Sequence, residues 1–225
     1  MLSFKKFSVL ALTLAATSVF AGPTVSYTSF GALPAANFGG SGIPNDAVAI
    51  TSLDTGVTLG LTATPRFASP AVTNNGAGQF NATPGAYAPG DNLALWSFNF
   101  FVGHSISSTI GRHTYKLLGD YNPAVGDAES TYADISFYLG VADSLLTPGT
   151  IQNSENLGFG TNLAQFDPNV AGQYGFILAA FNDAGAEVGR SAILVNVGQV
   201  PEPASLALAG VALLGMFGSM RRKRG

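Results

Sequence analysis

Short stretches of alternating apolar and polar residues, separated by turns rich in Gly, Pro and Asn, run through the chain from residue 22 to residue 198. Alternation with a period of two places one set of side chains on each face of an extended strand, so it predicts half-buried β-strands. The clearest stretches are 57–64, 96–102, 134–139, 174–180 and 193–197, and weaker ones are 24–30, 47–53 and 114–118. No stretch has the pattern of a capped amphipathic helix, which parallel βαβ units would need. The sequence therefore predicts an all-β body, an antiparallel β-sandwich or jelly roll.

Two details refine this expectation. The polar, Gly-containing turn at 181–185 lies between two of the best strands, so 173–181 and 186–197 should pair as an antiparallel hairpin. The long segment 66–92 is rich in Pro, Gly, Ala and Asn, and either holds a short strand near 78–82 or runs over the surface. Phe101 and Phe181 fall on the opposite face from their apolar neighbours, which makes them candidates for an edge, a second core face or a partner surface.

The chain has no cysteine, which excludes a disulfide framework, a thiolate nucleophile and cysteine-based metal sites. Stability must then come from the burial of apolar side chains. Hydrophobic residues make up 47% of the sequence, including 16 Phe and 7 Tyr, so the chain can supply such a core. We expect most of the aromatic residues to lie in it, although aromatic faces can also form a platform for sugars.

Charge is segregated along the sequence. The segment from residue 22 to residue 200 contains four basic and twelve acidic residues, for a net charge of −8, whereas basic residues gather near both ends of the chain. An acidic body gains no affinity by neutralising phosphates, which argues against nucleic-acid binding and against adhesion to anionic lipids.

Residues 1–21 have the pattern of a secretory signal helix. Lys5 and Lys6 precede an apolar run, and small or compact residues occupy the positions before the expected cleavage site after Ala21. We therefore expect signal peptidase to remove this segment during export.

The sequence contains no recognisable catalytic motif. His104 and His113 are the only histidines, and Gly103-His104-Ser105-Ile106-Ser107 has Ser107 where a nucleophile elbow requires glycine. We expect surface or loop histidines, no catalytic, cofactor-binding or metal-binding residues, and a protein that is not an enzyme.

One alternative uses the acidic residues between Asp120 and Asp143. Asp120, Asp127, Glu129, Asp134 and Asp143 could hold calcium between loops or supply carboxylates to a carbohydrate-binding module or weak glycan hydrolase. The segment after Asp120 fails as an EF-hand loop, because Ala124, Val125 and Thr131 stand at essential positions. Aspartates that cap turns are the simpler interpretation of these acids.

The C-terminal segment has three parts in a fixed order. Pro201, Glu202 and Pro203 are followed by an uncharged apolar run over 204–220, and then by Arg221, Arg222, Lys223 and Arg224. A helix over the apolar run would be about 26 Å long, enough to span the cytoplasmic membrane when flanking residues reach the interface. The basic cluster should stay in the cytoplasm, which places the body outside it. On these grounds alone the tail predicts a single-span anchor.

This tail resembles the PEP-CTERM sorting signal of exported proteins in Gram-negative bacteria that make exopolysaccharide. The resemblance rests on the motif 201–203, the helix opening Ala204-Ser205-Leu206-Ala207 and the basic end 221–224. It implies recognition by a membrane-embedded exosortase, removal of the tail, and release or attachment at the cell surface or in the extracellular matrix. It implies no activity for the body.

The sequence thus predicts three parts: a signal peptide (1–21), a β-sandwich body (22–198) and a sorting tail (199–225). The leading hypothesis is an exported, non-enzymatic surface or matrix protein associated with exopolysaccharide, held in the cytoplasmic membrane transiently or permanently.

Overall fold

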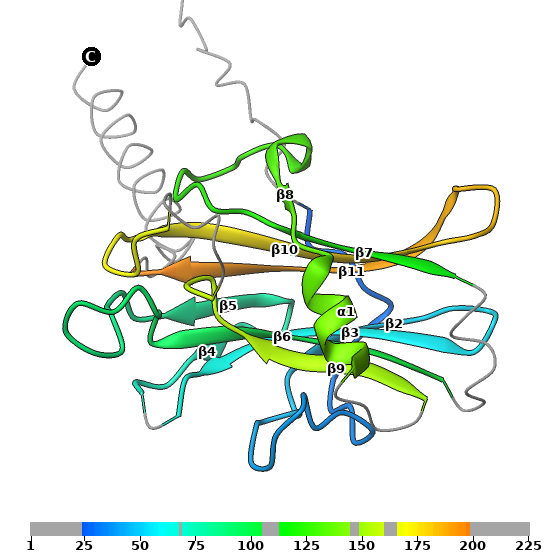
Figure 1. Cartoon of the computed structure of the whole chain (residues 1–225), viewed down its shortest axis with the longest axis horizontal. Helices are drawn as coiled ribbons and strands as arrows, with labels where there is room; N and C mark the ends of the chain where they lie inside the picture. The colour runs from blue at the N-terminus through cyan, green and yellow to red at the C-terminus, as the bar shows by residue number, and fades with distance from the viewer. Residues whose placement is uncertain (1–23, 68, 105–112, 145–148, 160–165, 199–225) are drawn as a thin grey trace, which may run out of the picture.

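A computed structural model of the protein describes residues 24–67, 69–104, 113–144, 149–159 and 166–198. The predicted signal helix (1–21) and the predicted sorting tail (199–225) lie outside these residues. Two β-sheets lie one over the other and form the body (Figure 1). The prediction of a mostly β, two-sheet body is therefore confirmed.

The first sheet has five strands, in the order β1-β2-β3-β6-β9, and every neighbouring pair is antiparallel. Their bounds are β1 (Ser29–Gly31), β2 (Val48–Ser52), β3 (Val57–Pro65), β6 (Trp96–His104) and β9 (Thr150–Glu155). The predicted strands at 47–53, 57–64 and 96–102 are confirmed as β2, β3 and β6.

The second sheet has six strands, in the order β4-β5-β11-β10-β7-β8. Their bounds are β4 (Thr73–Asn74), β5 (Gln79–Ala82), β11 (Glu187–Val197), β10 (Gly172–Phe181), β7 (Thr114–Gly119) and β8 (Ala133–Asp134). The predicted hairpin is confirmed, since β10 and β11 pair antiparallel from Gly172 opposite Val197 onward. One pair departs from the expectation of an antiparallel sandwich, because β5 joins β11 in parallel.

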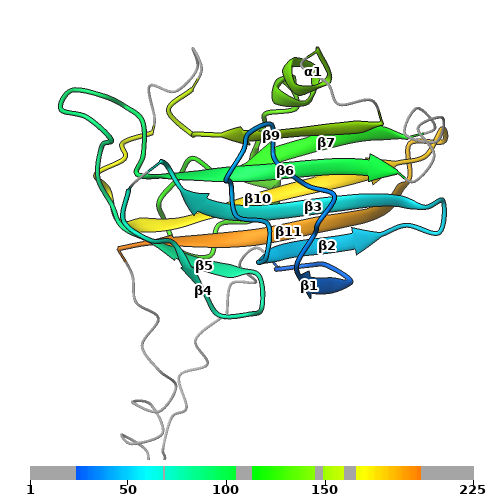
Figure 2. The same ribbon diagram turned by 90° about the horizontal axis from the view of Figure 1, so that it is seen from below.

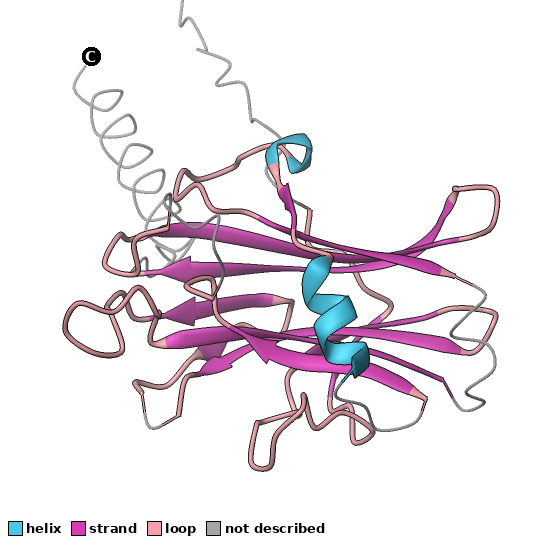
Figure 3. Ribbon diagram, viewed as in Figure 1, coloured by secondary structure: helices cyan, strands magenta, loops and turns pink. Residues whose placement is uncertain are grey.

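The strand predicted over 134–139 is wrong. Helix α1 (Phe137–Ser144) follows the 3-10 helix η2 (Glu129–Thr131) and the short strand β8, and it lies along the side of the sandwich against β9 and β7 (Figure 3). Ile135, Tyr138 and Leu139 are buried, whereas Phe137 is 54% exposed. Burial at i, i+3 and i+4 is the helical pattern, and it overrides the alternation that the same residues display.

The main core fills the space between the two sheets. Alternate residues of β3, β6, β10 and β11 point inward and are buried, as their period-two patterns predict; they include Leu59, Leu61, Phe98, Phe100, Phe176, Leu178 and Val195. Phe98 of the first sheet stacks on Phe176 of the second with ring centroids 4.3 Å apart. The ring centroid of Trp96 lies 5.8 Å from that of Tyr174 and 6.1 Å from that of Phe176. Aromatic pairs therefore join the two sheets directly.

A smaller apolar cluster covers part of the outer face of the first sheet. Phe101 points away from the main core and packs with Leu33, Ala36, Phe38 and Val48, so it belongs to a second core face, one of the roles predicted for it. The chain between β1 and β2 crosses this face, as the blue segment in Figure 2 shows. Gln152 of β9 anchors the crossing, because its Oε1 accepts hydrogen bonds from the backbone N–H groups of Asn37 and Phe38, each 2.9 Å long.

Phe181 occupies the corresponding position on the other sheet. It is partly buried against an apolar cluster of Tyr132, Ile177, Ala179 and Ala192. The Nζ of Lys116 lies 5.5 Å from the centroid of the Phe181 ring.

Asn156 fixes the chain just after β9 to the chain entering β6. Its side chain is fully buried, and its Oδ1 accepts hydrogen bonds from the N–H groups of Ala94 and Gly158 at 2.9 and 3.0 Å. Its Nδ2 donates to the carbonyls of Ala94 and Trp96 at 3.0 and 2.7 Å. One buried amide thus satisfies four backbone groups just beyond the end of β9.

Changing Asn156→Asp should lower the free energy of unfolding by about 3–5 kcal/mol at pH 7, because a carboxylate would face two buried carbonyl oxygens. Urea unfolding measures this change, and the loss should shrink at pH 4, where a protonated carboxyl can donate to one carbonyl. Asn74→Asp is the matched control, since Asn74 is exposed and its Oδ1 only accepts from the N–H of Gly76. Equal losses in the two variants would contradict the role given to Asn156.

Candidate functional site

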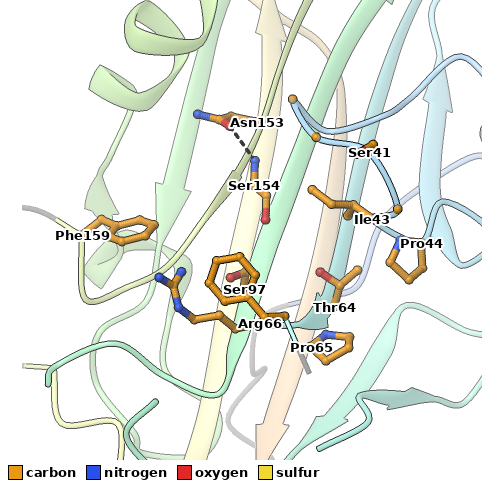
Figure 4. Close-up of a pocket in the computed structure, with 14 residues that line it drawn as sticks. Ser41, Ile43, Pro44, Thr64, Pro65, Arg66, Ser97, Asn153, Ser154 and Phe159 are labelled. Carbon is orange, nitrogen blue, oxygen red and sulfur yellow. Dashed lines mark hydrogen bonds between the residues drawn. The ribbon is translucent and has the colours of Figure 1, made fainter. Parts of the chain in front are cut away.

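A pocket of about 560 Å³ lies on the outer face of the first sheet, beside the segment that crosses it. Thr64 of β3, Ser97 of β6 and Ser154 of β9 form its floor. The loop 39–44 forms one wall, and Arg66 and Phe159 form another (Figure 4). Phe67 also lines the pocket. The pocket thus combines hydroxyl groups, loop backbone, aromatic rings and one cation.

The floor offers hydrogen-bonding groups because it is the polar face of the sheet. Thr64 and Ser97 are directly opposite each other in the β3–β6 register, so their side chains share this face. Asn99, which is fully buried, donates from Nδ2 to the Oγ1 of Thr64 at 3.0 Å. Because Thr64 accepts this bond, its hydroxyl hydrogen remains available to donate to a ligand.

The wall formed by Gly39, Gly40, Ser41 and Gly42 approaches the sheet closely. Gly39 has a φ of 76°, and a Cβ atom placed there would lie 2.9 Å from the Oδ1 of Asn153. Only glycine accommodates both conditions easily. Small residues here also leave loop backbone groups accessible beside the floor.

Three aromatic rings surround the Arg66 side chain. The central guanidinium carbon lies 4.9 Å from the ring centroid of Phe67, 5.2 Å from that of Tyr87 and 4.9 Å from that of Phe159. The Phe67 and Tyr87 rings are also in contact, with centroids 5.5 Å apart. We call Arg66, Phe67, Tyr87 and Phe159 the aromatic clamp.

Phe67 combines an exposed aromatic side chain with a backbone conformation that is unfavourable for a bulky residue. Its side chain is 74% exposed, and its backbone φ is 50°, in the left-handed region that bulky residues avoid. Tyr87, beside it, is 44% exposed. Exposed apolar rings at a strained backbone position, next to a pocket, are the pattern expected of a binding surface.

Three of the acids predicted for a calcium or carboxylate site have local hydrogen-bond or ion-pair partners in the described part of the chain. Glu129 pairs with Arg190 at 2.6 Å, and the Oδ1 of Asp134 accepts from the N–H of Ser136 at 2.9 Å, hydrogen bonding that lowers the pKa of Asp134. Asp120 is buried, caps the turn through the N–H of Asn122 at 3.0 Å, and has its pKa raised to about 6, chiefly by burial. The Asp143 side chain lies outside the described residues.

The described side chains also offer no cluster of metal ligands. Within the described ranges, no group of three or more His, Asp or Glu residues lies close enough together to hold a metal ion. None of the acids between Asp120 and Asp134 lines the pocket. Asp120 and Asp134 cap turns and Glu129 pairs with Arg190, in line with the simpler interpretation, whereas the Oδ2 of Asp127 is buried without a hydrogen-bond partner.

The two histidines meet at one residue, Thr55, in the turn between β2 and β3. The Nε2 of His104 lies 2.8 Å from the carbonyl oxygen of Thr55, and the Nε2 of His113 lies 3.0 Å from its Oγ1. Neither histidine lines the pocket. Their contacts instead connect the start of β7 and the end of β6 to this turn.

Sequence reasoning missed the functional candidates Arg66 and Phe67 and the perturbed acid Glu155. Arg66 begins the segment 66–92, which lacks periodicity, and the aromatic residues weighed as a platform are mostly core residues.

Glu155 ends β9, whose polar sequence shows no alternation. Burial raises the pKa of Glu155 from 4.5 to about 7, and a hydrogen bond of 2.7 Å from the Nδ2 of Asn153 partly offsets this effect.

The raised pKa of Glu155 predicts a pH-dependent stability. The folded protein holds this proton more tightly than the unfolded chain, so the contribution is fully present below pH 4.5 and is lost as pH rises through about 7. Glu155→Gln should therefore raise the free energy of unfolding by about 1–3 kcal/mol at pH 8 and leave it nearly unchanged at pH 4.

Denaturant unfolding at both pH values measures this difference. Asp183→Asn in the exposed β10–β11 turn is the control, and it should change stability little at either pH. A Glu155→Gln variant with the same effect at pH 4 and pH 8 would contradict the prediction.

Comparison with known proteins assigns the tail. Residues 199–223 match the PEP-CTERM protein-sorting motif. The chain carries a PEP-CTERM sorting motif. This motif implies processing by an exosortase-type membrane enzyme and export toward the cell envelope.

The match leaves the body without an assignment. No curated protein and no solved structure matches the chain. No described helix is long and apolar enough to cross a membrane, and the predicted span 204–220 lies outside the described residues. The function of the body must therefore be argued from its pocket.

Proposed function

We propose that this PEP-CTERM protein is a non-enzymatic glycan-binding protein of the cell surface or extracellular matrix, associated with exopolysaccharide. The observation that carries the proposal is the pocket with its hydroxyl floor and its exposed aromatic clamp. The sorting motif at 199–223 supports the location, because it directs the body toward the envelope, where such glycans occur.

The chemistry of the pocket fits a sugar. A sugar ring has an apolar C–H face that packs on an aromatic ring and a rim of hydroxyls that need hydrogen-bonding partners. Phe67 and Tyr87 present exposed ring surface, and Thr64, Ser97 and Ser154 present hydroxyls on the adjoining floor. A polysaccharide lying along the pocket would contact both.

The residues of the pocket also support binding without hydrolysis. Glycoside hydrolysis uses two carboxyl groups that flank the bond to be broken. The described residues that line the pocket include no Asp, Glu or His, so they supply no general acid, base or carboxylate nucleophile.

The predicted signal segment and the sorting tail deliver the body to the cell surface in this proposal. In this proposal signal peptidase cleaves after Ala21, and the segment 204–220 holds the protein in the cytoplasmic membrane until an exosortase-type enzyme removes the tail. The body is then released or attached at the surface.

Removing one ring of the clamp should weaken glycan binding. Phe67→Ala and Tyr87→Ala should each reduce affinity for exopolysaccharide of the producing cells about tenfold, because each deletes an exposed stacking surface of about 1 kcal/mol or more. Affinity electrophoresis in gels containing the polysaccharide gives the dissociation constants.

Phe137→Ala is the matched control for this experiment. Phe137 is 54% exposed but belongs to α1 rather than to the pocket, so its removal should leave the affinity unchanged. Undiminished binding by both clamp variants would refute the assignment of this pocket.

The sorting motif makes a separate prediction. Replacing Pro201, Glu202 and Pro203 by alanines should leave the protein in the cytoplasmic membrane fraction with an intact C-terminus, whereas the unaltered protein is processed. Mass spectrometry of the C-terminal peptide distinguishes the two forms, with Asp183→Ala in the exposed hairpin turn as the control. Normal removal of the altered tail would show that the motif is not what the processing enzyme recognises.

A further inference from the structure

We propose that the pocket selects acidic glycans, and that Arg66 binds the carboxylate of a uronic acid residue. This inference rests on the proposed function and adds the charge class of the ligand to it. The observation behind it is a cation held beside the hydroxyl floor, with one buried hydrogen-bond donor, its Nε, that has no partner.

Arg66 is an unpaired cation within the described part of the chain. It forms no ion pair there, and its Nε is buried without a hydrogen-bond partner. Arg190 differs, because its guanidinium binds both Glu129 and Glu187 at 2.6 Å. A buried donor without a partner is unfavourable in the free protein, and a ligand that accepts from it removes that penalty.

The three rings of the aromatic clamp hold Arg66 without using its hydrogen-bond donors. Aromatic rings attract a guanidinium through their faces, whereas its N–H groups point outward in its own plane. The rings of Phe67, Tyr87 and Phe159, all within 5.2 Å of the guanidinium carbon, can therefore hold Arg66 without using its N–H groups. Figure 4 shows the side chain extending along the pocket toward Phe159.

A carboxylate is the acceptor that best matches this arrangement. Its two oxygens can accept parallel hydrogen bonds from the planar fork of an arginine, and such charge-assisted bonds are about twice as strong as neutral ones. The described residues that line the pocket include no acid to compete for Arg66. Thr64, Ser97 and Ser154 are then left for the hydroxyls of the same sugar.

The acidic body does not prevent this binding, although its net charge of −8 repels a polyanion at long range. At physiological ionic strength that repulsion is screened over about 8 Å, so contacts inside the pocket decide the affinity. Binding of an acidic glycan should consequently persist in moderate salt.

The test compares three polymers on the full-length protein, purified in detergent. Isothermal titration calorimetry with polygalacturonate, its fully methyl-esterified form and neutral dextran separates charge from ring shape. We expect the acidic polymer to bind at least tenfold more tightly than the ester. Arg66→Gln should remove this preference, so that the acidic polymer and the ester bind with equal affinity.

Two further variants keep the test decisive. Arg66→Lys keeps the charge but loses the planar fork, so it should retain only part of the preference, and it serves if Arg66→Gln does not fold. Lys116→Gln removes a cation that is not part of the pocket and should change nothing. Far-ultraviolet circular dichroism confirms that each variant is folded.

The outcomes separate this inference from the proposed function. Equal affinity for the acidic polymer and its ester, together with weaker binding by Tyr87→Ala, would overturn the role of Arg66 and leave glycan binding in place. Dextran sulfate is added to the three polymers to test the acceptor, and equal binding of dextran sulfate and polygalacturonate would overturn the assignment to a carboxylate. Absence of binding to every polymer, the native exopolysaccharide included, would overturn both proposals.

Discussion

Aromatic packing between the two sheets is the contact on which the rest of the body depends. No disulfide can join the sheets, because the chain has no cysteine. Phe98 and Phe176 stack across the interface, and Trp96 contacts two rings of the opposite sheet. Burial of such large side chains supplies the stability that small exported domains often obtain from disulfides.

This core leaves the outer face of the first sheet for other purposes. Part of that face carries a second apolar layer, in which the segment between β1 and β2 covers Phe101 and is held by Gln152. The adjoining part bears Thr64, Ser97 and Ser154 and stays open between the crossing segment and Arg66. The pocket exists because the cover stops short of the whole sheet.

The sequence was most informative where a single physical pattern determined the structure. Strands β3, β6, β10 and β11 are buried on the face that alternation indicated. The stretch around Ile135 satisfies both a period of two and the spacing i, i+3, i+4, and only packing against β9 and β7 decides between them. Strand β9 is polar and at the edge of its sheet, so it becomes recognisable only through its pairing with β6.

The candidate site could not be predicted in the same way. Arg66 and Tyr87 are distant in sequence, and the left-handed backbone of Phe67 has no signature in the residue itself. Of the acids that attracted attention, Asp120 and Asp134 cap turns and Glu129 pairs with arginine, which spacing alone cannot distinguish from ligand binding. The tail, by contrast, was readable because its three parts are contiguous in sequence.

Strand β11 ends at Val197, and only Gly198, Gln199 and Val200 separate it from Pro201. Three extended residues reach at most about 11 Å. A protein that binds the proline motif must therefore approach to within a short distance of the end of the folded sheet. The shape of the sandwich at that end, rather than the short spacer, sets how much room the cutting enzyme has.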